Sequence, residues 1–150
     1  MERYEKRMAK YEGMDMDEVI EPALQPNEKE LVLVTHYEFC FSSYDGKRTI
    51  WVDQEHRHLR PKGEGRSIMV SAFLCECHGP MKLSDEQKLL LPIVPLEVVR
   101  IIKPGKNEDG YRRNADLAKQ LQEEAIPIFK VLHPNFEAFF MFDYSLNHHA

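Results

Sequence analysis

Asp143 stands where sheet proteins commonly hold a functional carboxylate. Residues 136–142 are apolar except for Glu137, which predicts a central strand buried on both faces, and Asp143 follows that strand directly. Ligand and metal sites of α/β sheets usually lie at the carboxyl ends of strands. The alternative is a structural Asp that caps the turn after the strand. The residues around Asp143 leave both interpretations open.

Cys75-Glu76-Cys77-His78 holds three further side chains that can bind a metal ion. The spacing is Cys-x-Cys instead of the Cys-x-x-Cys of zinc motifs, and no second ligand pair follows at finger spacing. His148 and His149 could complete a site, but no pattern in the sequence brings them near. We therefore expect ordinary reduced thiols at the end of a strand.

Two groups of basic residues could contact phosphate, because Lys and Arg pair with phosphate oxygens and glycines allow close backbone approach. The alternative is a pair of solvated loops, where charge is expected. The first group comprises Arg57, Arg60, Lys62 and Arg66, and the second comprises Lys103, Lys106, Arg112 and Arg113.

The composition fits one globular domain, with 150 residues of which 43% are hydrophobic and 30% are charged. A net charge of -5 disfavours a chain that coats nucleic acid, although an acidic metal site acting on DNA stays possible. No apolar run approaches the ~20 residues of a membrane helix, and the charged N-terminus does not resemble a secretory signal. Three cysteines without framework spacing indicate reduced thiols and an intracellular protein.

The elements that would position these residues begin with a helical arm or linker over residues 1–30. Tyr4, Met8, Tyr11 and Met14 recur at helical spacing before the prolines at 22 and 26. Strands are predicted over residues 31–37, 49–52 and 67–74, with the Asp45-Gly46 dipeptide as a hairpin turn. This pattern predicts an antiparallel meander of three strands.

The second half predicts an excursion over residues 76–96 with one or two helical turns, and a strand over residues 98–102. A helix begins near Asn114, carries an apolar stripe, is kinked or broken at Pro127 and ends at His133-Pro134. The next strand, residues 136–142, returns parallel to the first. The fold class is therefore α/β, with a mixed sheet and a crossover helix.

Several segments, in this order and spacing, resemble the DDE-superfamily endonuclease domain of mariner-like transposases, in a form common in fungal genomes. The resemblance covers roughly the whole chain and includes the Thr35-His36 pair, the Asp45-Gly46 turn and the segment Phe142-Asp143-Tyr144-Ser145-Leu146-Asn147-His148. The other segments are residues 33–38, 45–51, 59–71, 101–110 and 125–129. The resemblance implies a ribonuclease-H-like fold and metal-dependent DNA cleavage and strand transfer, the chemistry of a transposable element.

The resemblance also implies a site of Mg²⁺ or Mn²⁺ ions held by three carboxylates. Two such ions clamp the attacking and leaving oxygens of a phosphodiester. Asp143 matches the second acid and is the expected metal ligand. Tyr37 replaces the first acid, which follows the Thr-His pair in the family. The position of the third acid lies beyond Ala150, so we expect a C-terminally incomplete domain.

Glu38 is a weak candidate to replace the missing first acid. Strand side chains alternate between faces, so Glu38 should point away from the face of Tyr37. One remaining carboxylate should bind Mg²⁺ weakly or not at all, because this ion loses its waters reluctantly. A metal-dependent nuclease using Asp143 and Glu38 is therefore the least favoured of three hypotheses.

The favoured hypothesis is a degenerate, inactive DDE endonuclease domain over residues 31–150. The runner-up is a non-catalytic module that keeps the fold to bind DNA or a protein. By resemblance, the DNA path is bordered by Arg60, Lys62, Arg66, Lys103 and Lys106. No helix-turn-helix module precedes residue 31, so any DNA contact is expected to be non-specific. We further expect no membrane association, a nuclear location if the protein is functional, and self-association through an uncovered sheet.

Overall fold

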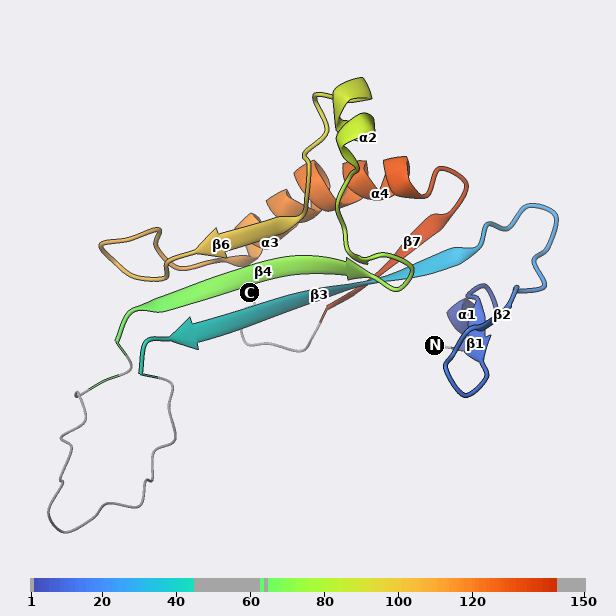
Figure 1. Cartoon of the computed structure of the whole chain (residues 1–150), viewed down its shortest axis with the longest axis horizontal. Coiled ribbons are helices and arrows are strands. Elements are labelled where there is room, and N and C mark those ends of the chain that lie inside the picture. The colour runs from blue at the N-terminus through green and yellow to red at the C-terminus, as the bar shows by residue number, and fades with distance from the viewer. Residues whose placement is uncertain (1, 45–62, 64, 143–150) are drawn as a thin grey trace, which may run out of the picture.

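A computed structural model describes residues 2–44, 63 and 65–142, with side chains from Tyr4 onward. These residues form a mixed α/β structure with one five-strand sheet and a small separate hairpin (Figure 1). The fold class predicted from the sequence is confirmed at this level. No helix in the described ranges is long and apolar enough to cross a membrane.

Strand β3 (Leu31–Ser42) is the centre of the sheet. It pairs antiparallel with β4 (Ser67–Cys75) and parallel with β7 (Glu137–Phe142). The far edge of β4 pairs antiparallel with both β6 (Val99–Ile102) and the two-residue β5 (Gly79–Pro80). The predicted parallel return strand is therefore confirmed, and β6 matches the strand expected after the excursion.

The predicted three-strand meander is wrong in its order, because its first and third strands pair directly and antiparallel with each other. The Asp45-Gly46 turn and the strand expected over residues 49–52 lie outside the described residues. Strand β4 pairs directly with β3 over nine residue pairs, from Val34 with Cys75 to Ser42 with Ser67. Among the described residues, β3 thus has β4 on one side and β7 on the other.

The crossover between β6 and β7 is a helix with an irregular centre. Helix α3 (Asn114–Gln120) continues through a π-helical turn (Leu121–Ala125) into α4 (Ile126–Leu132). Pro127 has no amide hydrogen and its ring would clash with the carbonyl four residues earlier, so the wider π turn accommodates it. The helix continues through Pro127 to Leu132 without the predicted break, and the irregularity is the π turn that precedes this proline. The helix ends at His133 as predicted.

Two helix starts carry side-chain caps. The Arg113 amide donates to Asp116 at 2.9 Å, so the N-cap is Arg113, one residue before the predicted Asn114. Helix α2 (Asp85–Leu90) confirms the short helix expected within the excursion. Ser84 forms a capping box there with Gln87, which satisfies two backbone amides at the helix start.

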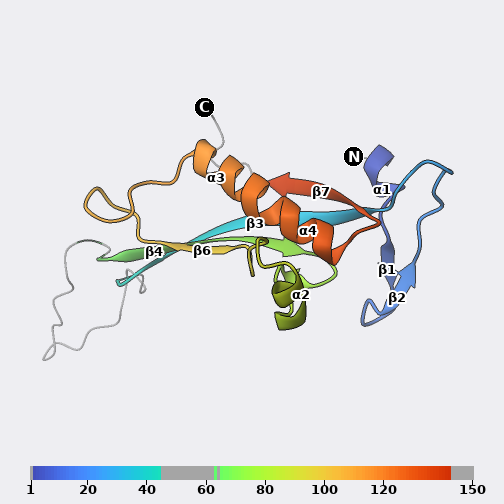
Figure 2. The ribbon, with the colours of Figure 1, turned by 90° about the horizontal axis from the view of Figure 1, so that it is seen from above.

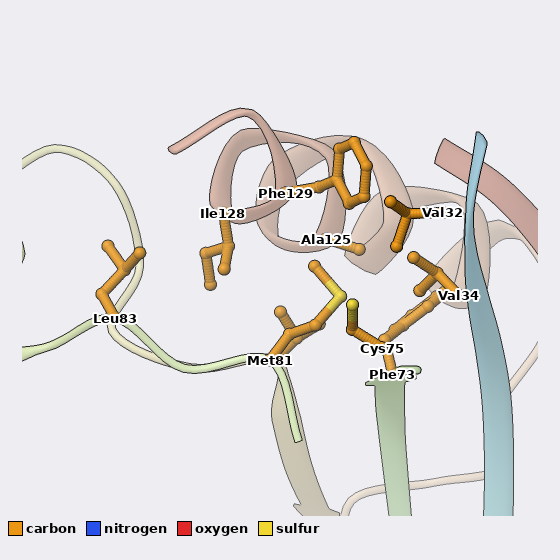
Figure 3. Close-up of a cluster of buried hydrophobic side chains, with 10 residues drawn as sticks. Val32, Val34, Phe73, Cys75, Met81, Leu83, Ala125, Ile128 and Phe129 are labelled. Carbon is orange, nitrogen blue, oxygen red and sulfur yellow. The ribbon is translucent and has the colours of Figure 1, made fainter. Parts of the chain in front are cut away.

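Helices α3 and α4 cover one face of the sheet (Figure 2). Side chains that alternate on β3 and β4 meet the crossover helix beneath it, where Val34, Phe73 and Ile128 are fully buried (Figure 3). Met81 and Leu83, from the excursion, complete this core. The single apolar layer between sheet and helix therefore holds the structure together.

The opposite face of the sheet is apolar and exposed in the described part of the chain. Its alternating positions include Tyr37, 43% exposed, and Phe39, 49% exposed. The remaining exposed apolar side chains on this face are Phe41, Ile68, Ile101 and Met141.

The prediction that residues 136–142 form a central strand buried on both faces is wrong for the described residues. There β7 pairs only with β3, at the edge of the sheet. Ala138, Phe140 and Phe142 face the helix, whereas Phe139 and Met141 face the open side. The apolar run thus contributes side chains to both faces of the sheet, of which only one is covered by the helix.

The N-terminal arm is mainly a hairpin and not a helix. Helix α1 (Glu2–Glu5) is one turn long, and β1 (Lys10–Glu12) pairs antiparallel with β2 (Glu18–Ile20). Gly13 has φ of 96° in the connecting turn, a conformation that favours glycine. The helical spacing of the arm was therefore a misleading pattern. Arg7 ties the arm to the sheet through Lys29 and Glu137.

Candidate functional site

Tyr37, at the expected first-acid position, points to the open face of β3. Its neighbours His36 and Glu38 point to the face covered by the helix, because side chains alternate along a strand. The last pair of β3 and β7 in the described residues is His36 with Phe142. Asp143, the one expected metal ligand, lies outside the described residues.

His36 belongs to a buried polar chain beneath the crossover helix. Its Nε2 lies 2.9 Å from Ser71 Oγ, and the Ser71 hydroxyl donates to Gln120 Oε1 at 3.0 Å. Because that hydroxyl has one hydrogen, His36 must donate from Nε2. Ser71 is fully buried, so these residues join two strands to α3 and are closed to substrate.

Glu38 is paired with a buried cation. Its Oε1 lies 2.8 Å from Nε of Arg112, whose side chain is 3% exposed. The two atoms are close but lack the angle of a hydrogen bond, so the contact is an ion pair. Burial lowers the pKa of Arg112, and the Glu38 carboxylate is the largest influence opposing that shift. Glu38 is thereby committed to a structural role on the face away from Tyr37.

The residues expected to border DNA are partly brought together. Arg66 and Lys103 line a hollow of about 500 Å³ at one end of β4, with Ser43 and Glu108 on its wall. Lys106 is exposed in the following loop but does not line the hollow. Arg60 and Lys62 lie outside the described residues. Of the second basic group, Arg112 is buried in the pair with Glu38 and is lost to a DNA surface.

Four potential metal ligands meet at the other end of β4. The ligand atoms of Cys75, Cys77, His78 and His133 all lie within 4.8 Å of one another. Cys75 Sγ is 3.3 Å from His133 Nε2 and 3.9 Å from His78 Nδ1. Cys75 and His133 are buried, whereas Cys77 and His78 are exposed. Two of the four ligands therefore lie in the interior and two reach solvent.

The local fold explains how a three-residue turn presents its ligands. Cys75 pairs with Gly79 across the β4–β5 turn, and Gly79 has φ of 68°, which favours glycine. The Glu76 carboxylate accepts the Leu33 amide at 2.7 Å, and the Glu76 amide donates to the Leu33 carbonyl at 3.1 Å. Glu76 thus fastens the turn to β3 and leaves Cys77 and His78 on the cluster side.

The surroundings of the cluster shift two pKa values. Burial, and then nearby His78, lower the pKa of His133, which favours the neutral imidazole. Burial, Cys75 and Glu76 together raise the pKa of Cys77 to about 11, although a hydrogen bond from Tyr11 opposes this. Tyr11 belongs to β1, so the N-terminal hairpin also reaches the cluster.

His133 is the residue that sequence reasoning missed at this cluster. His148 and His149, considered instead, lie outside the described residues. The predicted connectivity could have revealed His133, because a parallel crossover places the end of its helix beside the start of the first strand. The antiparallel neighbour β4 ends at that same edge, so Cys75 and His133 meet there.

No protein-family profile, no curated protein and no solved structure matches this chain.

Proposed function

We propose that the chain is a ribonuclease-H-like domain of DDE-transposase descent that does not cleave DNA. The observation that carries this proposal is that neither residue at the expected first-acid position can hold a metal ion. Tyr37 fills the first-acid position, and the adjacent Glu38 is paired with Arg112 on the opposite face of the sheet. Neither residue is therefore available to join Asp143 in holding metal ions, and a two-metal site needs a carboxylate at the first-acid position.

The arrangement of strands supports the descent. Two long antiparallel strands, β3 and β4, are followed by a third antiparallel strand, β6, and by a helical crossover to a parallel β7. This order, β6-β4-β3-β7, is the one that the resemblance implies for the first part of a ribonuclease-H-like sheet. Any Mg²⁺ or Mn²⁺ bound near Asp143 is held weakly.

A second candidate function is non-specific DNA binding without cleavage. It is favoured by the hollow in which Arg66 and Lys103 face a common space. Two cations at one end of the sheet suit phosphate contacts, whereas the net charge of -5 disfavours tight binding to DNA. We therefore assign weak, salt-sensitive binding to this end.

A plasmid-nicking assay in Mg²⁺ and in Mn²⁺ tests the main proposal. We expect no nicking by the natural protein, because Tyr37 supplies no carboxylate at the first-acid position and Glu38 is paired with Arg112. Metal-dependent nicking by the natural protein would contradict the proposal.

A salt titration of DNA binding tests the second function. We expect Arg66→Gln and Lys103→Gln to weaken binding and to reduce the dependence on salt by about one phosphate contact each. Lys130→Gln, an exposed lysine on α4, is the matched control and should change neither quantity. If all three variants weaken DNA binding equally, the hollow is not the DNA-binding site.

A further inference from the structure

The cluster at the end of β4 has the composition of a metal site. Two thiols and two imidazoles come from three parts of the fold: Cys75 from the end of β4, Cys77 and His78 from the β4–β5 turn, and His133 from the end of α4. This donor set is independent of the carboxylates discussed above. It is also independent of whether the domain descends from a transposase.

We propose that Cys75, Cys77, His78 and His133 form a closed binding site for Zn²⁺ or a similar soft divalent cation. In tetrahedral zinc sites the metal lies about 2.3 Å from sulfur and about 2.0–2.1 Å from nitrogen, which separates neighbouring ligand atoms by about 3.3–3.8 Å. The distances of 3.3 Å and 3.9 Å from Cys75 Sγ to the two imidazole nitrogens agree with that geometry. Because no two ligand atoms are more than 4.8 Å apart, closing the full set around an ion needs contractions of at most about 1.5 Å.

The ligands are held by ordered elements before any metal binds. Cys75 is fixed in the β3–β4 ladder, and His133 is fixed as the C-cap of α4, where its amide donates to Phe129 at 2.8 Å. Glu76 is occupied by the Leu33 amide, so the turn offers two ligands and not a third. Held ligands lose little freedom on binding, which favours affinity.

The predicted role of the metal is structural. Four protein ligands fill a tetrahedral site and leave no position for substrate. The ion joins the β4–β5 turn to the end of the crossover helix, next to the start of β7. Binding should therefore stabilise the sheet edge and helix together, which links the site to the core of the domain.

Titration of the chelator-treated full chain with Co²⁺ and then Zn²⁺ is the test. We expect one Co²⁺ per chain, with the intense visible bands of a tetrahedral ion and a thiolate charge-transfer band, both displaced by Zn²⁺. At free Zn²⁺ about 100-fold above its Kd, the melting temperature should rise by about 5–10 °C.

Variants in the exposed turn keep the test clear of folding defects. Cys77→Ser and His78→Ala should each lower metal affinity at least tenfold and remove most of the thermal shift. Cys40→Ser removes the third cysteine, exposed on β3 and outside the cluster, and should leave both readouts unchanged. His133→Gln should likewise weaken binding and change the spectrum.

Three results would overturn the proposal. One is the absence of a tetrahedral thiolate spectrum in the natural protein. Another is a spectrum that Cys40→Ser removes and Cys77→Ser preserves. The last is tight binding that is unchanged in His133→Gln, because the crossover helix would then supply no ligand. The plasmid-nicking result bears on none of these outcomes.

Discussion

Replacing Glu38 by Gln should destabilise the protein through the buried charge that it leaves behind. The Glu38 side chain is 15% exposed and that of Arg112 is 3% exposed, and their charged atoms are 2.8 Å apart. Gln retains the shape of the side chain but removes its charge. The Arg112 guanidinium also contacts Gln120, so it is not left without any polar neighbour.

The expected cost follows from this geometry. Removing one partner of a fully buried ion pair costs about 3–5 kcal/mol. The partial exposure of Glu38, the angle that is poor for a hydrogen bond and the contact with Gln120 reduce this to about 2–3 kcal/mol. At about 2–4 °C per kcal/mol, the melting temperature should fall by about 4–12 °C.

Urea unfolding followed by circular dichroism measures the loss. Glu123→Gln is the matched control, because Glu123 is 57% exposed and lies 3.9 Å from Lys119 in a surface pair. That change should cost about 0.5 kcal/mol or less. The double variant Glu38→Gln/Arg112→Met should recover most of the loss, since both charges are gone. If Glu38→Gln lowers the free energy of unfolding no more than Glu123→Gln does, the reasoning is refuted. Glu38 would then again be a candidate metal ligand.

Two further predictions concern the open face and the arm. The purified protein should self-associate through the exposed apolar side chains of the open face, and Phe39→Thr should weaken this in sedimentation velocity, whereas Leu89→Gln on α2 should not. A monomeric natural protein at micromolar concentration would contradict this. Burial, then Glu21 and Glu76, raise the pKa of Glu30 above its ordinary 4.5, so its ionisation opposes folding. Glu30→Gln should therefore raise the melting temperature at pH 7, and the gain should vanish as the pH falls below the ordinary value.

The sequence predicted the strands and the crossover where local pattern and burial agree. Leu31 to Val34 form a compact apolar run, and they lie in the central strand of the sheet. The stripe from Leu117 to Ile128 packs on the core, and a π turn in the helix precedes Pro127. In these segments one burial pattern fits one structure, so periodicity is sufficient.

The errors arose where a pattern fits two structures. Tyr4, Met8 and Tyr11 fit a helix by spacing, but the arm forms a single helical turn followed by a short hairpin. Residues 136–142 are apolar as a central strand would be, yet Phe139 and Met141 face the open side of the sheet. Apolar content does not tell a covered face from an exposed one.

The metal-ligand cluster illustrates a different limit. Cys75, Cys77 and His78 are close in sequence and were visible as a motif, whereas His133 is 55 or more residues away. Only the sheet topology brings that imidazole to the end of β4. Spacing rules for zinc fingers describe ligands within one short unit, so they miss a site completed by a crossover helix.

The most direct test of the proposed descent is the relation between Tyr37 and Asp143. We predict that the register of β3 and β7, which pairs His36 with Phe142, continues for one residue and sets Tyr37 opposite Asp143. Side chains of such a pair lie within reach of a disulfide. In the Cys40→Ser background, Tyr37→Cys/Asp143→Cys should therefore oxidise readily to a disulfide that peptide mapping assigns to positions 37 and 143. Phe39→Cys/Asp143→Cys, displaced by about 6.8 Å along the strand, should not. Equal or preferred cross-linking in the second pair would contradict the assignment of the two acid positions, and with it the proposed origin of the domain.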